Sequence, residues 1–166
     1  MEKQVDNMCI AYKRHKLRLL LLFMITPIAV GIISTLLSKD RMFSWGDMVK
    51  PPLAPPGWLF PVAWTILYLL MGYAGYLIYQ SDSDDKGSTL CVWISQLFLN
   101  FTWSPLFFRF DLKVLAAIVL VALLVLIGLL ISMARKAGKL PMFLLIPYFF
   151  WCSFALYLNI SIIVLN

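Results

Sequence analysis

Three amide side chains stand in stretches of the chain that are otherwise apolar. Gln96 and Asn100 lie in one such stretch and Asn159 in another. An amide carries hydrogen-bond donors and acceptors, and leaving them unpaired in hydrocarbon costs several kcal/mol. If these stretches are membrane helices, the amides must face the inside of a bundle. There they can hold helices together, contact a ligand or do both, and the sequence leaves these roles open.

Aromatic side chains accompany the amides at helical spacing. Residues three or four positions apart share a helix face. Three groups have this spacing: Trp64 with Tyr68; Asn100 with Trp103; and Tyr148 with Trp151, Ala155 and Asn159. Indole rings on such faces can line a pocket for a flat aromatic ligand by offset stacking, although simple core packing would give the same pattern. We therefore treat all these residues as candidate ligand contacts.

The side chains of ordinary enzyme chemistry are missing from the same stretches. They hold no acid–base pair, no metal-ligand cluster and no activated nucleophile, which are the usual marks of a catalytic site. His15 is the single histidine, and Cys9, Cys91 and Cys152 form no C-x-x-C pair. We interpret the cysteines as small packing residues. The sequence therefore predicts neither a metal site nor a required cofactor.

Five long apolar segments must position these residues. Of the 166 residues, 62% are hydrophobic and only 13% are charged, too few charges to cover a soluble domain of this size. About 20 apolar residues in a helix cross a ~30 Å hydrocarbon core. The expected spans are about 19–38, 58–80, 88–108, 114–134 and 140–164. The sequence thus predicts an all-α membrane protein, one domain built as a bundle of five transmembrane helices.

The basic residues are divided unevenly between the two sides of such a bundle. One side would carry about nine Lys and Arg, with Lys13, Arg14, Lys16 and Arg18 before the first span, and the other about five. The positive-inside rule then places the N-terminus in the cytoplasm. The net charge of +6 is explained in this way, and we expect no nucleic-acid partner. The first span has full length and no small-x-small cleavage site follows it, so we expect it to be retained rather than removed as a signal peptide.

A proline-rich loop from Lys50 to Trp58 connects the first two spans. Its prolines are Pro51, Pro52, Pro55 and Pro56. Proline excludes a regular helix here, so we expect a stiff extended segment that acts as a lid over one end of the bundle. Trp58 suits the membrane interface, where indole rings prefer to lie, and Trp45 and Trp93 could share that role.

Small residues form a ladder on one face of the third span. Gly87, Cys91 and Ser95 recur every four positions. Ladders of this kind let two helix backbones approach closely. The sequence therefore predicts that this face is the interface of a homodimer.

Four motifs appear in order along the chain. They are Lys50-Pro-Pro-Leu-Ala-Pro-Pro-Gly-Trp58; Trp64-Thr-Ile-Leu-Tyr68 with Met71-Gly72-Tyr73; Gln96-Leu-Phe-Leu-Asn100 with Trp103-Ser-Pro105; and Pro147-Tyr148 with Trp151, Ala155 and Leu158-Asn159. Together they resemble the translocator protein family, also known as tryptophan-rich sensory proteins (TspO/MBR) or peripheral-type benzodiazepine receptors. The resemblance covers about residues 45–159.

The resemblance implies five transmembrane helices, a ligand cavity under the first long loop, and frequent dimers. Family ligands include porphyrins such as protoporphyrin IX, synthetic isoquinoline carboxamides and benzodiazepines, and cholesterol in animal members. The family residues that help to line the cavity match five positions of this chain: Trp64, Asn100, Trp103, Trp151 and Ala155.

Two departures from the family pattern affect these expectations. The usual Phe-Gly-Pro-Val-Trp is replaced by Phe60-Pro-Val-Ala-Trp64, which changes the hinge of the expected lid. After Asn159 the chain has neither the tyrosine nor the following arginine of the animal cholesterol motif, and even the loose form of that motif needs a basic residue. We therefore expect no cholesterol recognition at this end, and a bacterial cell membrane as the location.

The leading functional hypothesis is a membrane receptor or carrier for a flat hydrophobic ligand, most plausibly a porphyrin. An alternative is a light-dependent enzyme that degrades porphyrin, with Trp64 and Trp151 as the photochemical groups. A further alternative is a structural or regulatory membrane partner without a ligand.

Overall fold

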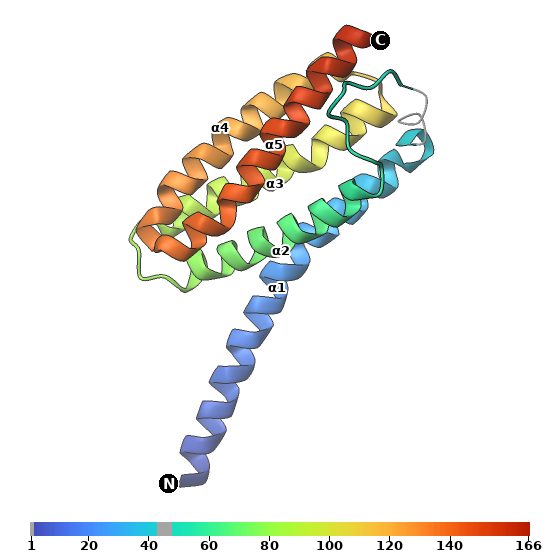
Figure 1. The fold of residues 1–166 in the computed structure, drawn as a ribbon. Helices are drawn as coiled ribbons and strands as arrows, with labels where there is room; N and C mark the ends of the chain where they lie inside the picture. The colour runs from blue at the N-terminus through green and yellow to red at the C-terminus, as the bar shows by residue number, and fades with distance from the viewer. Residues whose placement is uncertain (1, 43–47) are drawn as a thin grey trace.

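The chain folds into five long helices (Figure 1). The computed structural model describes the backbone of residues 2–42 and 48–166, and the side chains of residues 11–39 and 48–166. The elements in these ranges are α1 (Glu2–Met42), α2 (Leu59–Gln80), α3 (Lys86–Ser104), the π-helical turn η2 (Pro105–Arg109), α4 (Lys113–Ala137) and α5 (Lys139–Leu165). Short connections follow α2, η2 and α4, and a longer one, residues 43–58, lies between α1 and α2. All five α-helices are long and apolar enough to cross a membrane. The predicted five-helix membrane bundle is confirmed, while Trp45 and the side chain of Cys9 lie outside the described residues.

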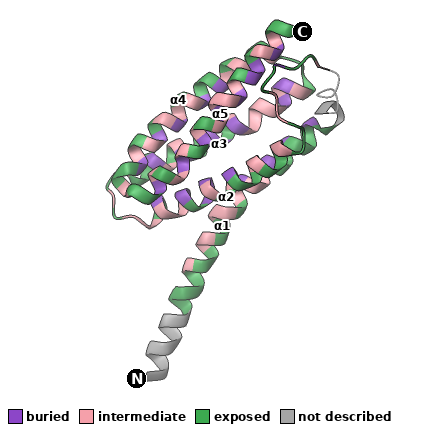
Figure 2. Cartoon of the chain, in the orientation of Figure 1, coloured by how far each residue is buried: buried purple, intermediate pink, exposed green. Residues whose placement is uncertain are grey.

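Helix α1 packs on the bundle with only part of its length. Figure 1 shows its N-terminal part projecting away from the other helices, and residues 11–22 of this part are mostly exposed (Figure 2). Packing begins near Phe23, whose ring contacts the rings of Tyr76, Tyr79 and Trp93. The exposed basic residues Lys13, Arg14 and Arg18 lie on the projecting part. This part of α1 therefore carries the positive charge that the sequence places before the first span.

Glycines on α2 allow α1 and α3 to approach closely. A Cβ atom on Gly72 would lie 2.6 Å from the Phe23 carbonyl oxygen and 2.9 Å from the Met24 Cα. A Cβ on Gly75 would lie 2.7 Å from the Trp93 ring. A methyl group at either position would therefore meet a neighbour, so both positions need glycine for this close packing.

Trp93 does not have the interface position suggested by its residue type. Its side chain is 4% exposed and lies in the core between α2 and α3. The indole Nε1–H donates to the Met71 carbonyl oxygen at 3.0 Å. The interface prediction is wrong for Trp93 because the missing side chain of Gly75 leaves room for its ring.

Helix α4 fills space behind the aromatic helices. It packs against α3 and α5. Its inward stripe of Leu120, Leu123, Ile127 and Leu130 is fully buried, whereas Val121 on the opposite side is 50% exposed. A helix that is apolar all round but buried on one side suits a bundle surrounded by lipid.

The third span ends in a wider turn instead of a regular α-helical one. Pro105 has no N–H group and cannot continue the α-helical hydrogen bonding. The Phe110 N–H donates to the Pro105 carbonyl oxygen at 3.0 Å, which is the i to i+5 pattern of a π-turn. This turn buries Phe107 and brings Phe108 to the same end of the bundle as the proline-rich loop.

Candidate functional site

A cavity of about 600 Å³ lies at the end of the bundle where the proline-rich loop joins α2. Its wall is built from α1, α2, the end of α3 with η2, and α5. Six of the eight candidate residues line it: Trp64, Tyr68, Asn100, Trp103, Ala155 and Asn159. The volume is within the range of small-molecule binding sites, about 300–1,000 Å³.

Aromatic rings contact one another in the cavity wall. The rings of Trp64 and Tyr68 stack at 5.4 Å with an angle of 29° between their planes. Trp103 and Phe107 stack at 5.8 Å, also at 29°, and Trp64 lies 6.4 Å from Trp103 at 35°. Phe108 lies edge-on to both Trp103 and Phe107, at 76°. The helical spacing of Trp64 with Tyr68 and of Trp103 with Phe107 produces the two stacked pairs, so much of the wall is aromatic.

Tyr148 and Trp151 do not line the cavity. Tyr148 is fully buried behind the wall, with its ring edge-on to Trp64 at 6.3 Å. Trp151 packs against Phe60 at 6.1 Å and against Phe154 at 5.9 Å. Tyr148 supports the wall from behind, and Trp151 flanks it.

A chain of hydrogen bonds connects α2, α3 and α5 behind the cavity. The Tyr68 hydroxyl donates to Asn100 Oδ1 at 3.0 Å, and Asn100 Nδ2 donates to the Tyr148 hydroxyl at 3.1 Å. That hydroxyl in turn donates to Gln96 Oε1 at 2.9 Å. Gln96 Nε2 completes the chain by donating to the Trp93 carbonyl oxygen at 3.0 Å. Gln96 and Asn100 therefore hold helices together, which is one of the roles left open by the sequence.

Asn159 differs from the other two amides. Its side chain is 1% exposed, and neither Nδ2 nor Oδ1 has a hydrogen-bond partner among the described residues. The indole nitrogen of Trp103, which lines the same cavity, is also without a partner there. Apart from the phenol of Tyr68, the described lining residues carry no ionisable group. The wall is therefore uncharged, with a few hydrogen-bonding groups in defined places.

Helix α1 contributes to the cavity in a way that the sequence reasoning missed. Gly31 and Ser34 line the wall. The Tyr68 ring lies over Gly31, where a Cβ would be only 2.1 Å from it, and the Ser34 hydroxyl donates to the Phe101 carbonyl oxygen at 2.7 Å. The spacing of Gly31, Ser34 and Ser38 is the signal that could have revealed this face, because small residues three or four apart mark a close helix contact.

The composition of the proline-rich loop predicted an extended segment, but the loop is not extended throughout. The Ala54 N–H donates to the Pro51 carbonyl oxygen at 2.9 Å, and the Leu59 N–H donates to that of Pro56 at 3.0 Å. The segment thus contains two turns. In the first turn Pro52 takes the second position, which proline favours, and in the second turn Gly57 takes it. Gly57 is the one residue of the loop from Lys50 to Trp58 that lines the cavity. Trp58 is 66% exposed, as an interface residue would be.

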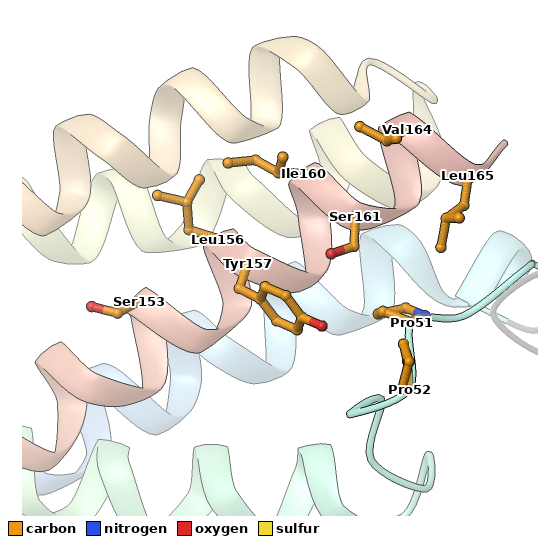
Figure 3. A pocket seen from close by; sticks show the side chains of 9 residues that line it. All are labelled: Pro51, Pro52, Ser153, Leu156, Tyr157, Ile160, Ser161, Val164 and Leu165. Atoms are coloured by element: carbon orange, nitrogen blue, oxygen red, sulfur yellow. The ribbon is translucent and has the colours of Figure 1, made fainter.

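The loop is attached to the end of α5 at its beginning. The Val49 N–H donates to Asn166 Oδ1 at 3.0 Å, and Asn166 Nδ2 donates to the Val49 carbonyl oxygen at 3.1 Å. Pro51 and Pro52 then border a second hollow, of about 670 Å³, on the outer face of α5. Figure 3 shows both prolines beside the C-terminal half of α5, near Tyr157 and Ser161. The first half of the loop therefore lies against α5, and its second half lies nearer the cavity.

The small-residue ladder of α3 lies on the outside of the bundle. Gly87, Cys91 and Ser95 are all exposed, and a Cβ on Gly87 would meet nothing within 4 Å. Cys152, in contrast, is a fully buried packing residue of α5. The ladder does not pack against the described residues of its own chain, so it is free for another helix.

A family model matches the part of the chain that forms the bundle and the cavity. The model of the TspO/MBR family matches residues 23–165, nearly the whole of the five-helix bundle. The chain belongs to the TspO/MBR family. It is accordingly an integral, multi-pass membrane protein.

Named relatives of the chain come from distant branches of life. It is 34% identical to the "Tryptophan-rich protein TspO" of Chlorobaculum tepidum over 84% of this chain and 90% of that protein. Identity to the "Translocator protein homolog" of Schizosaccharomyces pombe is 36%, over 86% and 88% of the two chains. The "Translocator protein" of Ovis aries is 33% identical over 82% and 83%. Bacterial, fungal and animal proteins thus share the TspO/MBR pattern with this chain.

Proposed function

We propose that this TspO/MBR protein is a membrane receptor or carrier that binds flat hydrophobic molecules, and that porphyrins are the leading class of ligand. The observation that carries the proposal is the cavity of about 600 Å³ whose wall contains the contacting rings of Trp64, Tyr68, Trp103 and Phe107. Aromatic rings gain most from a planar partner stacked with an offset. The names of its relatives, translocator protein and tryptophan-rich sensory protein, support a role in moving or sensing a small molecule.

The composition of the wall favours an apolar ligand over a charged one. The described lining holds no acidic or basic side chain, and an uncompensated charge in such a place is costly. A porphyrin would therefore place its macrocycle among the aromatic rings and its carboxylates toward the mouth of the cavity. The proline-rich loop, attached through Asn166, would limit the exit of the ligand.

Titration of the purified protein with protoporphyrin IX tests this proposal. A saturable shift of the Soret band at one porphyrin per chain is expected. Trp64→Leu should weaken binding about tenfold because a stacking face is lost, which corresponds to roughly 1.4 kcal/mol. Trp151→Leu is the matched control, since Trp151 lies outside the lining, and should have a smaller effect. An unsaturable signal, or no signal, would favour a partner protein without a ligand.

Illumination of the complex separates the receptor from the light-dependent enzyme. An enzyme consumes bound porphyrin faster than light bleaches the free dye, and a receptor does not. Trp64 is the photochemical candidate that lines the cavity, whereas Trp151 does not. Loss of a light-driven reaction in Trp64→Leu with porphyrin still bound would support the enzyme.

We further propose that the protein lies in a cell membrane with its N-terminus in the cytoplasm and forms homodimers. The basic residues on the projecting part of α1 support this orientation. The exposed ladder of Gly87, Cys91 and Ser95 supports a dimer through α3.

A further inference from the structure

Asn159 is a buried amide without a partner in the wall of a cavity. It lies on α5, one turn after Ala155, and both residues line the space. Its side chain is 99% buried, since 1% is exposed, and neither amide atom makes a hydrogen bond among the described residues. Asn100, which also lines the cavity, has partners for both amide atoms. The two asparagines thus differ in hydrogen bonding: Asn100 is fully paired, and Asn159 is unpaired among the described residues.

An unpartnered buried amide needs a physical reason. The large majority of buried side-chain polar atoms in proteins have a hydrogen-bond partner, and the exceptions call for an explanation. An apolar residue of similar size would avoid this cost at position 159. The indole N–H groups of Trp103 and Trp151 are also unpartnered among the described residues, and of the two only Trp103 lines the cavity. A molecule that enters the cavity is the partner within reach of its two unpartnered residues, Asn159 and Trp103.

We propose that Asn159 selects ligands that carry a neutral donor and acceptor side by side, as in a lactam or a primary amide. This inference rests on the proposed function and deepens it. The primary amide of Asn159 presents an N–H donor and a C=O acceptor along one edge. A ligand with a cis amide, such as a lactam, has a C=O acceptor and an N–H donor along its own edge, so the two can form a pair of antiparallel hydrogen bonds. The Trp103 N–H can donate to a further acceptor of the same molecule.

An ionised carboxylate is a poorer partner for this edge. One of its oxygens can accept from Nδ2, but the other would face Oδ1, and both of these atoms are acceptors. The described lining also offers no basic side chain that could neutralise the negative charge. The position therefore distinguishes neutral amide groups from carboxylates.

The side chain must turn toward the cavity to meet a ligand, because both amide atoms are closed to solvent. Ala155, one turn earlier on the same face, lines the cavity with only a methyl group. A turn of Asn159 toward the cavity breaks no hydrogen bond to the described residues.

Two small bicyclic probes test the proposal without depending on porphyrin. The first is 2-quinolinone, a flat lactam with N–H beside C=O, and the second is its N-methyl derivative, which has lost the donor. Binding is followed by quenching of tryptophan fluorescence in detergent. The wild-type protein should bind 2-quinolinone at least about tenfold more tightly than the N-methyl derivative. A site built to accept a hydrogen bond rejects an analogue that has lost the donor.

Substitutions then assign this preference to Asn159. In Asn159→Leu the ratio of the two affinities should fall to about one, with helical content unchanged. Thr65→Val is the matched control: Thr65 lines the cavity, but its hydroxyl already donates to the Pro61 carbonyl oxygen at 2.7 Å, so the preference should remain. If Asn159→Leu does not fold, Asn159→Ala makes the same test.

The outcomes separate this inference from the porphyrin proposal. Equal affinities in the wild-type protein, a preference retained in both Asn159 variants, or no binding of either probe would overturn the role of Asn159. A lactam preference that depends on Asn159, without a Soret shift on porphyrin addition, would support this role and remove porphyrin as the ligand. A Soret shift without a lactam preference would support porphyrin as the ligand and overturn the role of Asn159.

Discussion

Asn100 and Tyr148 are joined across α3 and α5 by a hydrogen bond of 3.1 Å from the asparagine amide to the tyrosine hydroxyl. The same asparagine accepts from Tyr68 on α2. One side chain therefore connects three helices directly behind the cavity wall. This position makes Asn100 a structural residue of the site as well as a lining residue, and it gives Asn159 a natural comparison.

Replacing each asparagine by leucine should have opposite consequences for stability. Asn100→Leu leaves the half-buried Tyr68 hydroxyl without its acceptor and removes a donor to the fully buried Tyr148 hydroxyl, and we expect a loss of about 1–3 kcal/mol. Asn159→Leu removes an amide that has no partner among the described residues, so stability should change by less than about 0.5 kcal/mol or increase. Thermal unfolding of both variants in one detergent makes the comparison. Equal destabilisation would mean that Asn159 is a structural amide too.

Glycine substitutions test the close packing of α1 on α2. Gly72→Ala places a methyl group against the backbone of Phe23 and Met24, and overpacking of this kind costs about 1–3 kcal/mol. Gly128→Ala on α4 is the matched control, since its Cβ would meet nothing within 4 Å. Removing a glycine from the middle of a helix should stabilise by roughly 0.5–1 kcal/mol. Thermal unfolding measures the stability of both variants. If Gly72→Ala and Gly128→Ala change it in the same direction, the close packing of α1 on α2 at Gly72 is contradicted.

The hydrophobic pattern determined much of the fold, because the bilayer requires long helices whose backbone groups are satisfied internally. Helical spacing also placed Trp64 with Tyr68 and Asn100 with Trp103, since residues on one face of a helix stay together whatever that helix packs against. The α5 residues that line the cavity are Ala155, Leu158, Asn159 and Ile162. Tyr148 and Trp151 share the predicted face but come about one to two helical turns before Ala155, so they lie beyond the end of the lining along α5.

Features that depend on distant parts of the chain were not predictable in this way. The contact of Val49 with Asn166 joins residues 117 positions apart, and nothing in the local sequence of either indicates it. The turns of the proline-rich loop were missed because proline suits both extended chain and turns. Trp93 was assigned to the interface from its type alone, whereas its position is decided by Gly75 on another helix.

The proline-rich loop should control how fast a ligand leaves. Replacing Pro55 by Gly and Pro56 by Ser removes two restraints on φ and gives the loop more conformations, so dissociation should be faster, with a smaller change in association. Asn166→Leu should act in the same direction, because it releases Val49 from α5. Stopped-flow displacement of bound porphyrin measures the off-rate. Unchanged off-rates in folded variants would make the loop a connector, with the exit elsewhere.

The small-residue ladder on α3 predicts the dimer contact. Ser95→Leu adds bulk to an exposed face and should reduce dimer formation, whereas ligand binding should be unaffected because Ser95 is not part of the cavity lining. Ala122→Leu, at an exposed position of α4, is the control. Crosslinking in membranes measures the dimer fraction. The same dimer yield in both variants would place the interface on a different helix.

Filling the cavity is the most direct test that it is the ligand site. Ala155 lines the cavity and is 6% exposed, and Ala155→Phe projects a ring into the space, while Ala122→Phe adds the same ring to the outside of α4. Equilibrium titration with protoporphyrin IX is made on both variants after helical content has been matched to the wild-type protein. We predict that Ala155→Phe weakens binding by a factor of ten or more, as expected when the loss exceeds roughly 1.4 kcal/mol, and that Ala122→Phe binds as the wild-type protein does. Equal binding by both variants would contradict the assignment of this cavity as the ligand site.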